Sequence, residues 1–207
     1  MKRLLLTSPK GGTGKTTLSR NAAVAAALSG LSVGTVDLDR QRSLTKWWAK
    51  RPADAASISH FDADMNDTAS VLTDISGFDL LVIDTPPAVE EHPADIQALL
   101  AAADFVLIPS QTTDDDTDSV VAWMAHVAGH RRLAAFVLNR IRRNTASLRT
   151  AKIKLNRAGQ LCPVEIPHTE DMARAAALGL GILEIKGGSG AEEIGGVWDF
   201  VRNGLDI

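Results

Sequence analysis

The sequence is poor in cysteine and has no long apolar run. Cys162 is the only cysteine among the 207 residues, which excludes an internal disulfide and a cysteine-rich metal site. No stretch of about 18 consecutive apolar residues occurs, so we expect no transmembrane helix. The first apolar run, Leu4 to Leu6, is too short for a secretory signal. These absences fit a protein of the reducing cytoplasm.

Acidic residues are missing from one segment. The whole chain has 22 basic and 25 acidic residues and a net charge of −3. Residues 131–157 contain nine of the basic side chains and no acidic one. They are Arg131, Arg132, Arg140, Arg142, Arg143, Arg149, Lys152, Lys154 and Arg157. The rest of the chain holds 13 basic and 25 acidic residues, a net charge of −12, which predicts a basic face on an acidic body.

Short apolar runs alternate with helical patterns along the whole chain. The runs predict strands over residues 3–7, 33–37, 57–61, 79–84, 104–109, 133–139 and 162–166. The helical patterns cover residues 15–29, 44–50, 68–75, 94–103, 115–130, 144–158, 171–178 and 192–203. This alternation predicts an α/β protein with a mostly parallel twisted sheet of about seven or eight strands and helices on both faces. Length and composition predict a single domain over residues 1–207.

A glycine-rich turn, SPKGGTGKTT at residues 8–17, joins the first predicted strand to the first predicted helix. Its second half matches the phosphate-binding pattern G-x-x-x-x-G-K-[ST], although Pro9 stands where the first glycine is usual. Glycines let the backbone turn its amides toward phosphate oxygens. Lys15 is then expected to reach the β and γ phosphates, and the Thr16 hydroxyl to bind Mg²⁺. The alternative is a glycine-rich turn that only starts a helix.

Two aspartates stand at or just beyond the ends of predicted strands. Asp39 lies just beyond the second strand, and Asp84 ends the fourth. Carboxylates at this edge of a parallel sheet are well placed for a magnesium shell. We expect Asp84 to act on Mg²⁺ through water, and Asp39 to orient or deprotonate an attacking water. The alternative for each is an aspartate of a strand-end turn.

Three motifs resemble those of the ParA/MinD family of cytoskeletal ATPases. Residues 10–17, KGGTGKTT, resemble the deviant Walker A box of that family. Residues 37–41, DLDRQ, resemble its D-x-D-P-Q stretch with Arg40 in place of proline, and residues 82–87, VIDTPP, resemble its Walker B motif. At just over 200 residues, the chain looks most like the small ParA proteins of plasmid partition. The resemblance implies a P-loop NTPase fold of the deviant Walker type.

The resemblance also implies a role for the extra lysine. In this family the early lysine, here Lys10, reaches across a dimer interface to the nucleotide of the partner. Phosphoryl transfer to water needs cationic stabilisation of the γ-phosphate oxygens, and a cation supplied in trans is worth about 10³–10⁵ in rate. The implied catalytic residues are therefore Lys10, Lys15 and Asp39, and the implied metal-binding residues are Thr16, Asp39 and Asp84.

The implied nucleotide-binding residues extend beyond the loop. The family's S-P-x-D segment is altered here to residues 112–116, with Asp116 keeping the acid. The Asn139 amide is expected to bind adenine, since it offers both a donor and an acceptor, and Pro167 to border the same pocket. The full set is Lys10, Gly11, Gly12, Thr13, Gly14, Lys15, Thr16, Thr17, Asp116, Asn139 and Pro167.

The basic segment is expected to contact DNA. No aromatic residue interleaves its cations, which favours phosphate contacts on a duplex over stacking with single-stranded bases. ParA dimers bind DNA nonspecifically, and the resemblance implies the same here. The candidate contacts are Arg142, Arg143, Arg149, Lys152 and Arg157. The alternative is a solvated basic face that pairs with the acidic body.

The resulting hypothesis is a Mg²⁺-dependent ATPase switch that positions or segregates DNA or another cargo. As the resemblance implies, ATP makes a homodimer that binds nonspecific double-stranded DNA, and a ParB-like or small centromere-binding adaptor triggers hydrolysis. We then expect a cytoplasmic protein that is nucleoid-associated when ATP-bound. The alternatives are a MinD-like ATPase of the membrane surface, a small-molecule synthetase and a scaffold without turnover. The acidic terminal helix disfavours stable membrane association, and the single cysteine excludes an iron protein of nitrogenase type.

Overall fold

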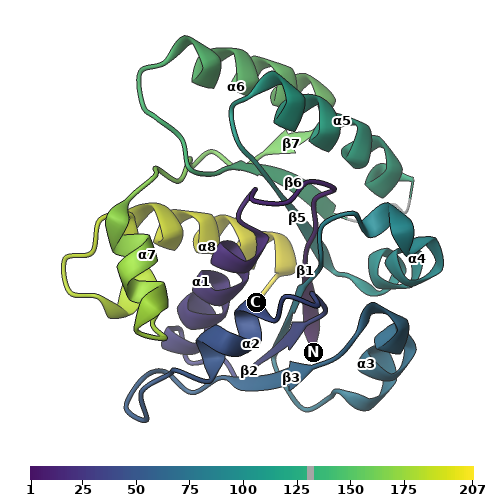
Figure 1. Cartoon of the computed structure of the whole chain (residues 1–207), viewed down its shortest axis with the longest axis vertical. Helices are drawn as coiled ribbons and strands as arrows, with labels where there is room; N and C mark the ends of the chain where they lie inside the picture. Colours follow the sequence, from purple (N-terminus) through teal and green to yellow (C-terminus); the bar gives the residue numbers. More distant parts are fainter. Residues whose placement is uncertain (130–132) are drawn as a thin grey trace.

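Parallel strands form one twisted sheet through the centre of the molecule (Figure 1). The computed structural model describes residues 1–129 and 133–207. The strands are β1 (Lys2–Leu6), β2 (Val33–Asp37), β3 (Ser59–Asp62), β4 (Leu80–Asp84), β5 (Phe105–Ser110), β6 (Leu133–Leu138) and β7 (Gln160–Leu161). They lie in the order β3-β2-β4-β1-β5-β6-β7, and every pair is parallel. The predicted sheet is confirmed.

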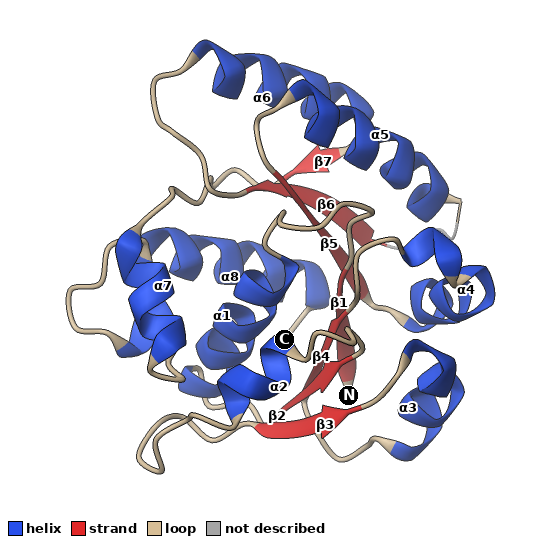
Figure 2. Ribbon diagram, viewed as in Figure 1, coloured by secondary structure: helices blue, strands red, loops and turns tan. Residues whose placement is uncertain are grey.

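Helices cover both faces of this sheet (Figure 2). They are α1 (Lys15–Leu28), α2 (Ser43–Trp48), α3 (Thr68–Asp74), α4 (Pro93–Ala102), α5 (Asp114–Ala128), α6 (Ala146–Ala158), α7 (Glu170–Ala177) and α8 (Ala191–Leu205). Three short 3-10 turns are η1 (Met65–Asp67), η2 (Val89–Glu91) and η3 (Ile182–Glu184). Helices α1, α2, α7 and α8 pack on one face, and α3 to α6 on the other.

Strand β4 shows why the central strands read as unbroken apolar runs. Leu80 and Val82 point into the layer of α1 and α8, whereas Leu81 and Ile83 point into the layer of α4 and α5. All four side chains are buried. A strand with helices on both faces needs apolar residues at every position, so the lack of polar alternation reflects this double burial.

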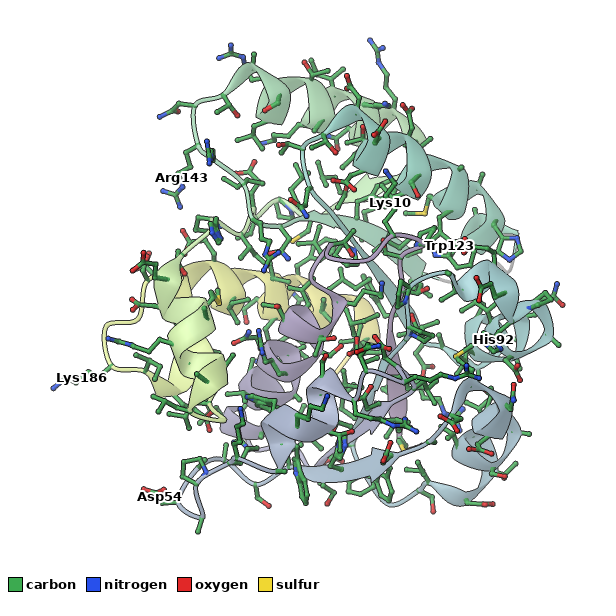
Figure 3. The ribbon with its side chains drawn as sticks, viewed as in Figure 1. Lys10, Asp54, His92, Trp123, Arg143 and Lys186 are labelled. Carbon is green, nitrogen blue, oxygen red and sulfur yellow. The ribbon has the colours of Figure 1, made fainter. Side chains whose placement is uncertain are left out.

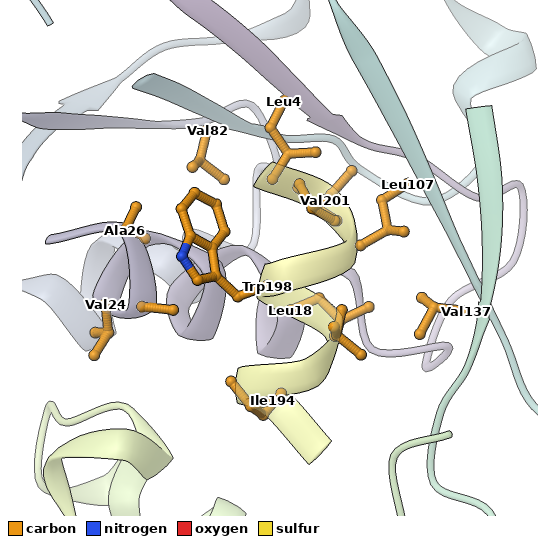
Figure 4. Close-up of a cluster of buried hydrophobic side chains, with 14 of the residues drawn as sticks. Leu4, Leu18, Val24, Ala26, Val82, Leu107, Val137, Ile194, Trp198 and Val201 are labelled. Carbon is orange, nitrogen blue, oxygen red and sulfur yellow. The ribbon is translucent and has the colours of Figure 1, made fainter. Parts of the chain in front are cut away.

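The terminal helix α8 docks onto the sheet (Figure 4). Ile194, Trp198 and Val201 are buried against residues of α1 and the central strands. The indole Nε1 of Trp198 donates to Ser29 Oγ at the end of α1, at 3.1 Å. No helix among residues 1–129 and 133–207 is long and apolar enough to cross a bilayer.

The prediction of a strand over residues 162–166 is wrong. The last strand, β7, ends at Leu161, one residue before the predicted start. The chain still follows β6 beyond that point, because Cys162 N donates to Phe136 O and Ile166 N to Leu138 O. Pro163 has no amide hydrogen to give to the ladder, which explains why no regular strand forms there. The predicted helix 115–130 begins at Asp114, and its expected end at residue 130 lies outside the described residues.

The sheet brings the ends of three strands to one level. In the parallel register, Leu6 of β1 and Asp37 of β2 both lie beside Asp84 of β4. The turn after β1 and the two acidic strand ends therefore meet at the carboxyl edge of the sheet. Ligands of open parallel sheets bind at this edge.

A buried ion pair fastens the layer of α2 to η3. Arg51 and Glu184 lie 2.8 Å apart, with side chains only 7% and 8% exposed. Glu184 also accepts hydrogen bonds from the amides of Ala56 and Gly181. Removing Glu184 would leave the buried charge of Arg51 unpaired and two backbone donors without this acceptor.

We predict that Glu184→Ala lowers the free energy of unfolding by about 3 kcal/mol, since breaking a buried pair is costly. Urea denaturation followed by circular dichroism measures this. The control is Asp118→Ala, which removes the partner of Lys154 at a site where the aspartate is 71% exposed. That change should cost less than about 1 kcal/mol. Equal losses of stability in the two variants would contradict the assignment.

Candidate nucleotide-binding site

The glycine-rich loop between β1 and α1 has a backbone that needs its glycines. Gly12 and Gly14 have φ angles of 77° and 101°, in the left-handed region that side chains disfavour. A Cβ on Gly14 would lie 1.9 Å from the Asn139 amide nitrogen. A side chain at Gly14 would therefore have to displace the Asn139 amide.

Two carbonyls of the loop, those of Gly12 and Thr13, bond to side chains of other segments. Asn139 Nδ2 donates to Thr13 O at 2.9 Å, and Gln111 Nε2 donates to Gly12 O at 3.1 Å. Within the described parts of the chain, no hydrogen bond engages the amides of residues 11–14. The buried hydroxyls of Thr7, Ser8 and Thr13 also lack a partner there. These hydrogen-bond donors, which have no acceptor in the described residues, together form a concave site for an anion.

Lys15 lies at the centre of this loop. Its ammonium donates to Ser8 O at 3.1 Å and to Lys10 O at 3.0 Å, and the residue is only 7% exposed. Burial lowers the pKa of Lys15, and the charges of Asp84, Asp39 and Glu90 act in the opposite direction. The cation is thus held where the phosphates of a nucleotide are expected.

Asp84 is tied to the first turn of α1. It accepts hydrogen bonds from Thr16 Oγ1 at 2.6 Å and from Ser19 Oγ at 2.9 Å. The carboxylate is completely buried, and this burial raises the pKa of Asp84 to about 7. The structure therefore brings together Thr16 and Asp84, the two residues predicted to bind metal. Their oxygens, of the kind that Mg²⁺ prefers, lie side by side next to the phosphate loop.

These residues fit Mg²⁺ that is shared with a nucleotide. In the described residues, no group of three or more histidine, cysteine, aspartate or glutamate side chains could hold a metal alone. Mg²⁺ keeps several waters and commonly binds through one or two carboxylates plus substrate phosphates. Thr16 and Asp84 would supply the protein's share of such a shell, since a nearby cation stabilises the ionised form of a buried carboxylate with a raised pKa.

The two aspartates after β2 have different surroundings. Asp37 is buried and accepts from the amide and hydroxyl of Thr45, at 2.9 and 3.0 Å, so it caps α2. Asp39 is half-buried, accepts from the Gln41 amide at 2.9 Å, and lines a pocket of about 250 Å³ with Ala88 and His92. Its predicted roles on water and Mg²⁺ remain predictions.

Lys10 and Asp116 meet across the loop. The Lys10 ammonium lies 3.9 Å from Asp116 Oδ1, and the lysine side chain is 39% exposed. Asp116 is held in place by the Thr113 hydroxyl, which donates to its Oδ2 at 2.7 Å. Figure 3 shows Lys10 close to α5. Asp116 thus lies beside the phosphate loop, and its expected role at the nucleotide stays a prediction.

Asn139 and Pro167 line one small pocket beside α1, together with Thr17. Asn139 Nδ2 donates one of its two N–H groups to Thr13 O, so its second N–H and the acceptor Oδ1 are left for a ligand. An acceptor suits the exocyclic amino group of adenine. The adenine contact stays a prediction.

The basic segment is partly neutralised by acids of neighbouring elements. Arg143 pairs with Glu193, and Lys152 with Glu165. Arg142, Arg149 and Arg157 are exposed and have no ion pair within the described residues. Arg143 projects from the rim of the molecule in Figure 3. Arg131 and Arg132 lie outside the described residues.

Sequence reasoning missed Ser19, Glu90 and Arg20. Ser19 lies one turn after Lys15 on α1 and bonds Asp84, so helical spacing from Thr16 was a usable signal. Glu90 acts on Lys15 from η2, and no local pattern marks it. Arg20 lies one turn after Thr17 and bonds its hydroxyl at 3.0 Å.

We predict that Asp84→Asn stabilises the magnesium-free, nucleotide-free protein, and more so at pH 8 than at pH 5. The Asp84 carboxyl has a folded pKa of about 7 against an ordinary value of 3.8. The folded state thus binds more protons in this window, and the contribution of Asp84 to stability falls as pH rises through it. Thermal unfolding of both proteins in EDTA measures this. A melting-temperature difference that is the same at both pH values would contradict the prediction.

The chain is similar to known proteins over most of its length. Residues 4–182 match the family model described as the CobQ/CobB/MinD/ParA nucleotide binding domain. The sequence is 37% identical to the maintenance of carboxysome distribution protein A of Gloeobacter kilaueensis over 101 residues, which are 49% of this chain and 45% of that relative. It is 26% identical to the protein of the same name from Halothiobacillus neapolitanus over 201 residues, 92% of each chain.

The fold is similar to that of the cell division ATPase MinD of Pyrococcus furiosus. The TM-score is 0.81 at 18% sequence identity, covering 98% of this chain and 99% of that one. The family model covers far more than half of the sequence, including the phosphate loop and Asp84. The chain therefore belongs to the CobQ/CobB/MinD/ParA family of nucleotide-binding domains.

Proposed function

We propose that this protein is a Mg²⁺-dependent ATPase whose two copies close on two ATP molecules. The observation that carries the proposal is the position of Lys10. Lys15 already occupies the centre of its own loop, whereas Lys10 lies half-exposed at the loop's outer edge, beside Asp116. A second cation so placed is available to the phosphates of another subunit.

The chain's own residues divide the chemistry between them. The free amides of the loop and the Lys15 ammonium bind the β and γ phosphates. Asp39 orients the attacking water, and Lys10 of the second copy neutralises charge on the γ-phosphate oxygens. Thr16 and Asp84 would hold Mg²⁺, which when bound would neutralise charge on the phosphates.

Asp116 gives Lys10 a resting partner. Before dimerisation the Lys10 ammonium lies near this carboxylate, and in the dimer it exchanges that anion for a phosphate. Hydrolysis and phosphate release then remove the γ-phosphate that Lys10 contacts in the dimer. The pairing with Asp116 then favours the separate chains, so nucleotide state controls assembly.

We further propose that the ATP-bound dimer positions a cargo by binding nonspecific DNA. The relatives named for maintenance of carboxysome distribution support a protein cargo, and the exposed Arg142, Arg149 and Arg157 support phosphate contacts. An adaptor on the cargo, ParB-like or a small centromere-binding type, would trigger hydrolysis. The protein would be cytoplasmic and nucleoid-associated when ATP-bound, without stable membrane association.

We predict that Lys10→Ala stays monomeric with Mg²⁺ and a non-hydrolysable ATP analogue, while the wild type dimerises. Its turnover should fall about 10³-fold or more, because the second subunit no longer supplies a cation in trans. Gel filtration with light scattering and phosphate release measure the two effects. Lys186→Ala, a change in the loop after η3, is the control and should behave as wild type. A wild type that stays monomeric with the analogue would refute the proposal.

We predict that Arg142, Arg149 and Arg157 carry most of the DNA affinity. The triple alanine variant should bind duplex DNA more weakly than wild type at the same salt concentration. The slope of log K against log salt should become shallower by roughly 0.9 for each DNA phosphate that the variant no longer neutralises. Fluorescence anisotropy across a salt series measures this with the ATP analogue bound.

Lys152→Ala is the matched control, because Lys152 is paired with Glu165 and its removal should change the slope little. If the triple variant keeps the wild-type slope, these arginines do not contact DNA. Vesicle flotation with anionic lipid tests the membrane alternative in the same conditions.

A further inference from the structure

A small pocket beside the amino end of α1 is lined by cations and by no acid. Its lining includes Thr17, Arg20, Asn139, Arg140 and Pro167, and its volume is about 100 Å³. It adjoins the phosphate loop, because Thr17 directly follows Thr16 and Asn139 bonds Thr13 O. Two arginines in one pocket without a carboxylate favour an anionic ligand.

Arg20 is a half-buried guanidinium with few partners. Within the described residues its only hydrogen bond goes to Thr17 Oγ1, at 3.0 Å, and no carboxylate is in ion-pair contact with it. Burial lowers the pKa of Arg20 to about 10; the charge of Asp84 acts in the opposite direction, and that of Arg140 in the same direction as burial. A guanidinium has five N–H donors, so most of its hydrogen-bonding capacity is unused.

Arg140 reaches the same pocket from a strained backbone. Its φ angle is 54°, in the left-handed region, where an arginine is disfavoured. Its guanidinium lies 3.4 Å from Gly12 O of the phosphate loop. Strained residues that persist at a ligand-binding edge are commonly kept for a function.

We propose that Arg20, with Arg140, binds the α-phosphate of the nucleotide. This inference rests on the proposed nucleotide-binding function. In the proposed function, Lys15 and the loop amides hold the β and γ phosphates. The protein backbone then passes through Thr17 to the pocket that Asn139 and Pro167 also line. The α-phosphate must lie between these two places, and Arg20 extends from one turn beyond Thr17. The planar fork of a guanidinium matches two phosphate oxygens.

The inferred role differs from that of Lys10. The α-phosphate is present in both ATP and ADP, so Arg20 contributes the same binding energy before and after hydrolysis. Such uniform binding raises affinity without accelerating the chemical step. Arg20 therefore distinguishes nucleotides from shorter phosphate compounds and leaves the dimer switch to the γ-phosphate.

The test compares Arg20→Met with wild type by isothermal titration of Mg²⁺-ADP, a Mg²⁺-bound non-hydrolysable ATP analogue and Mg²⁺-pyrophosphate. We expect both nucleotides to bind roughly ten- to hundredfold more weakly, as for the removal of a charge-assisted hydrogen bond. Pyrophosphate, which the loop and Lys15 hold without the pocket, should bind unchanged. The control is Arg174→Met on α7, where Arg174 is 64% exposed and pairs with Asp171.

A second variant separates binding from folding. Arg140→Gly relieves a left-handed position, so it should melt no lower than wild type while also binding both nucleotides more weakly. Wild-type affinity for ADP in Arg20→Met, or an equal weakening of pyrophosphate binding, would overturn the inference. If Arg20→Met fails to fold, tight ADP binding by Arg140→Gly overturns it. A wild type that binds none of the three ligands would instead refute the proposed function itself.

Discussion

The hydrogen-bonded contact between Asp84 and the first turn of α1 organises the site. Asp84 ends a completely buried strand, and its two oxygens accept from Thr16 and Ser19. The parallel register places this carboxylate level with the end of β1 and with Asp37 of β2. The phosphate loop therefore starts beside the carboxylate that is expected to share its metal. The distances within the site follow from strand pairing, and the loop needs only glycine to turn above it.

Charges are buried in two different ways in this molecule. Away from the site, Arg51 and Glu184 neutralise each other and satisfy neighbouring backbone groups. At the site, Asp84 and Arg20 are removed from water without an ion-pair partner in the described residues. Burial of a charge opposes folding. The attraction of Arg20 to Asp84, and of Asp84 to Lys15, offsets this only in part, and a bound metal–nucleotide complex would supply further opposite charges. The empty site therefore lowers the stability of the folded protein, and binding of the ligand raises that stability again.

The surface charge follows from tertiary pairing as much as from composition. The segment without acids meets acids from other elements, because Glu193 lies on α8, Glu165 follows β7 and Asp118 lies on α5. Only part of the basic segment is left to interact with a polyanion. In the same way, Asp116 on α5 receives Lys10 from the phosphate loop. Charge counts along the sequence overestimate the charge that a partner meets, since folding brings opposite charges together.

The sequence by itself determined the parallel sheet, the two helical layers, the phosphate loop and the roles expected of Thr16 and Asp84. These features depend on local periodicity and on motifs whose members are close in the chain. The tertiary structure alone decided that Asn139 bonds the loop through its amide nitrogen, and that no carboxylate of the described residues is in ion-pair contact with Arg20. It likewise decided that Asp37 caps a helix while Asp39 faces a pocket. It also decided where the last strand ends, because Pro163 interrupts a ladder whose partner strand is distant in sequence. Side-chain direction and pairing arise from contacts between distant segments, and no local pattern encodes them.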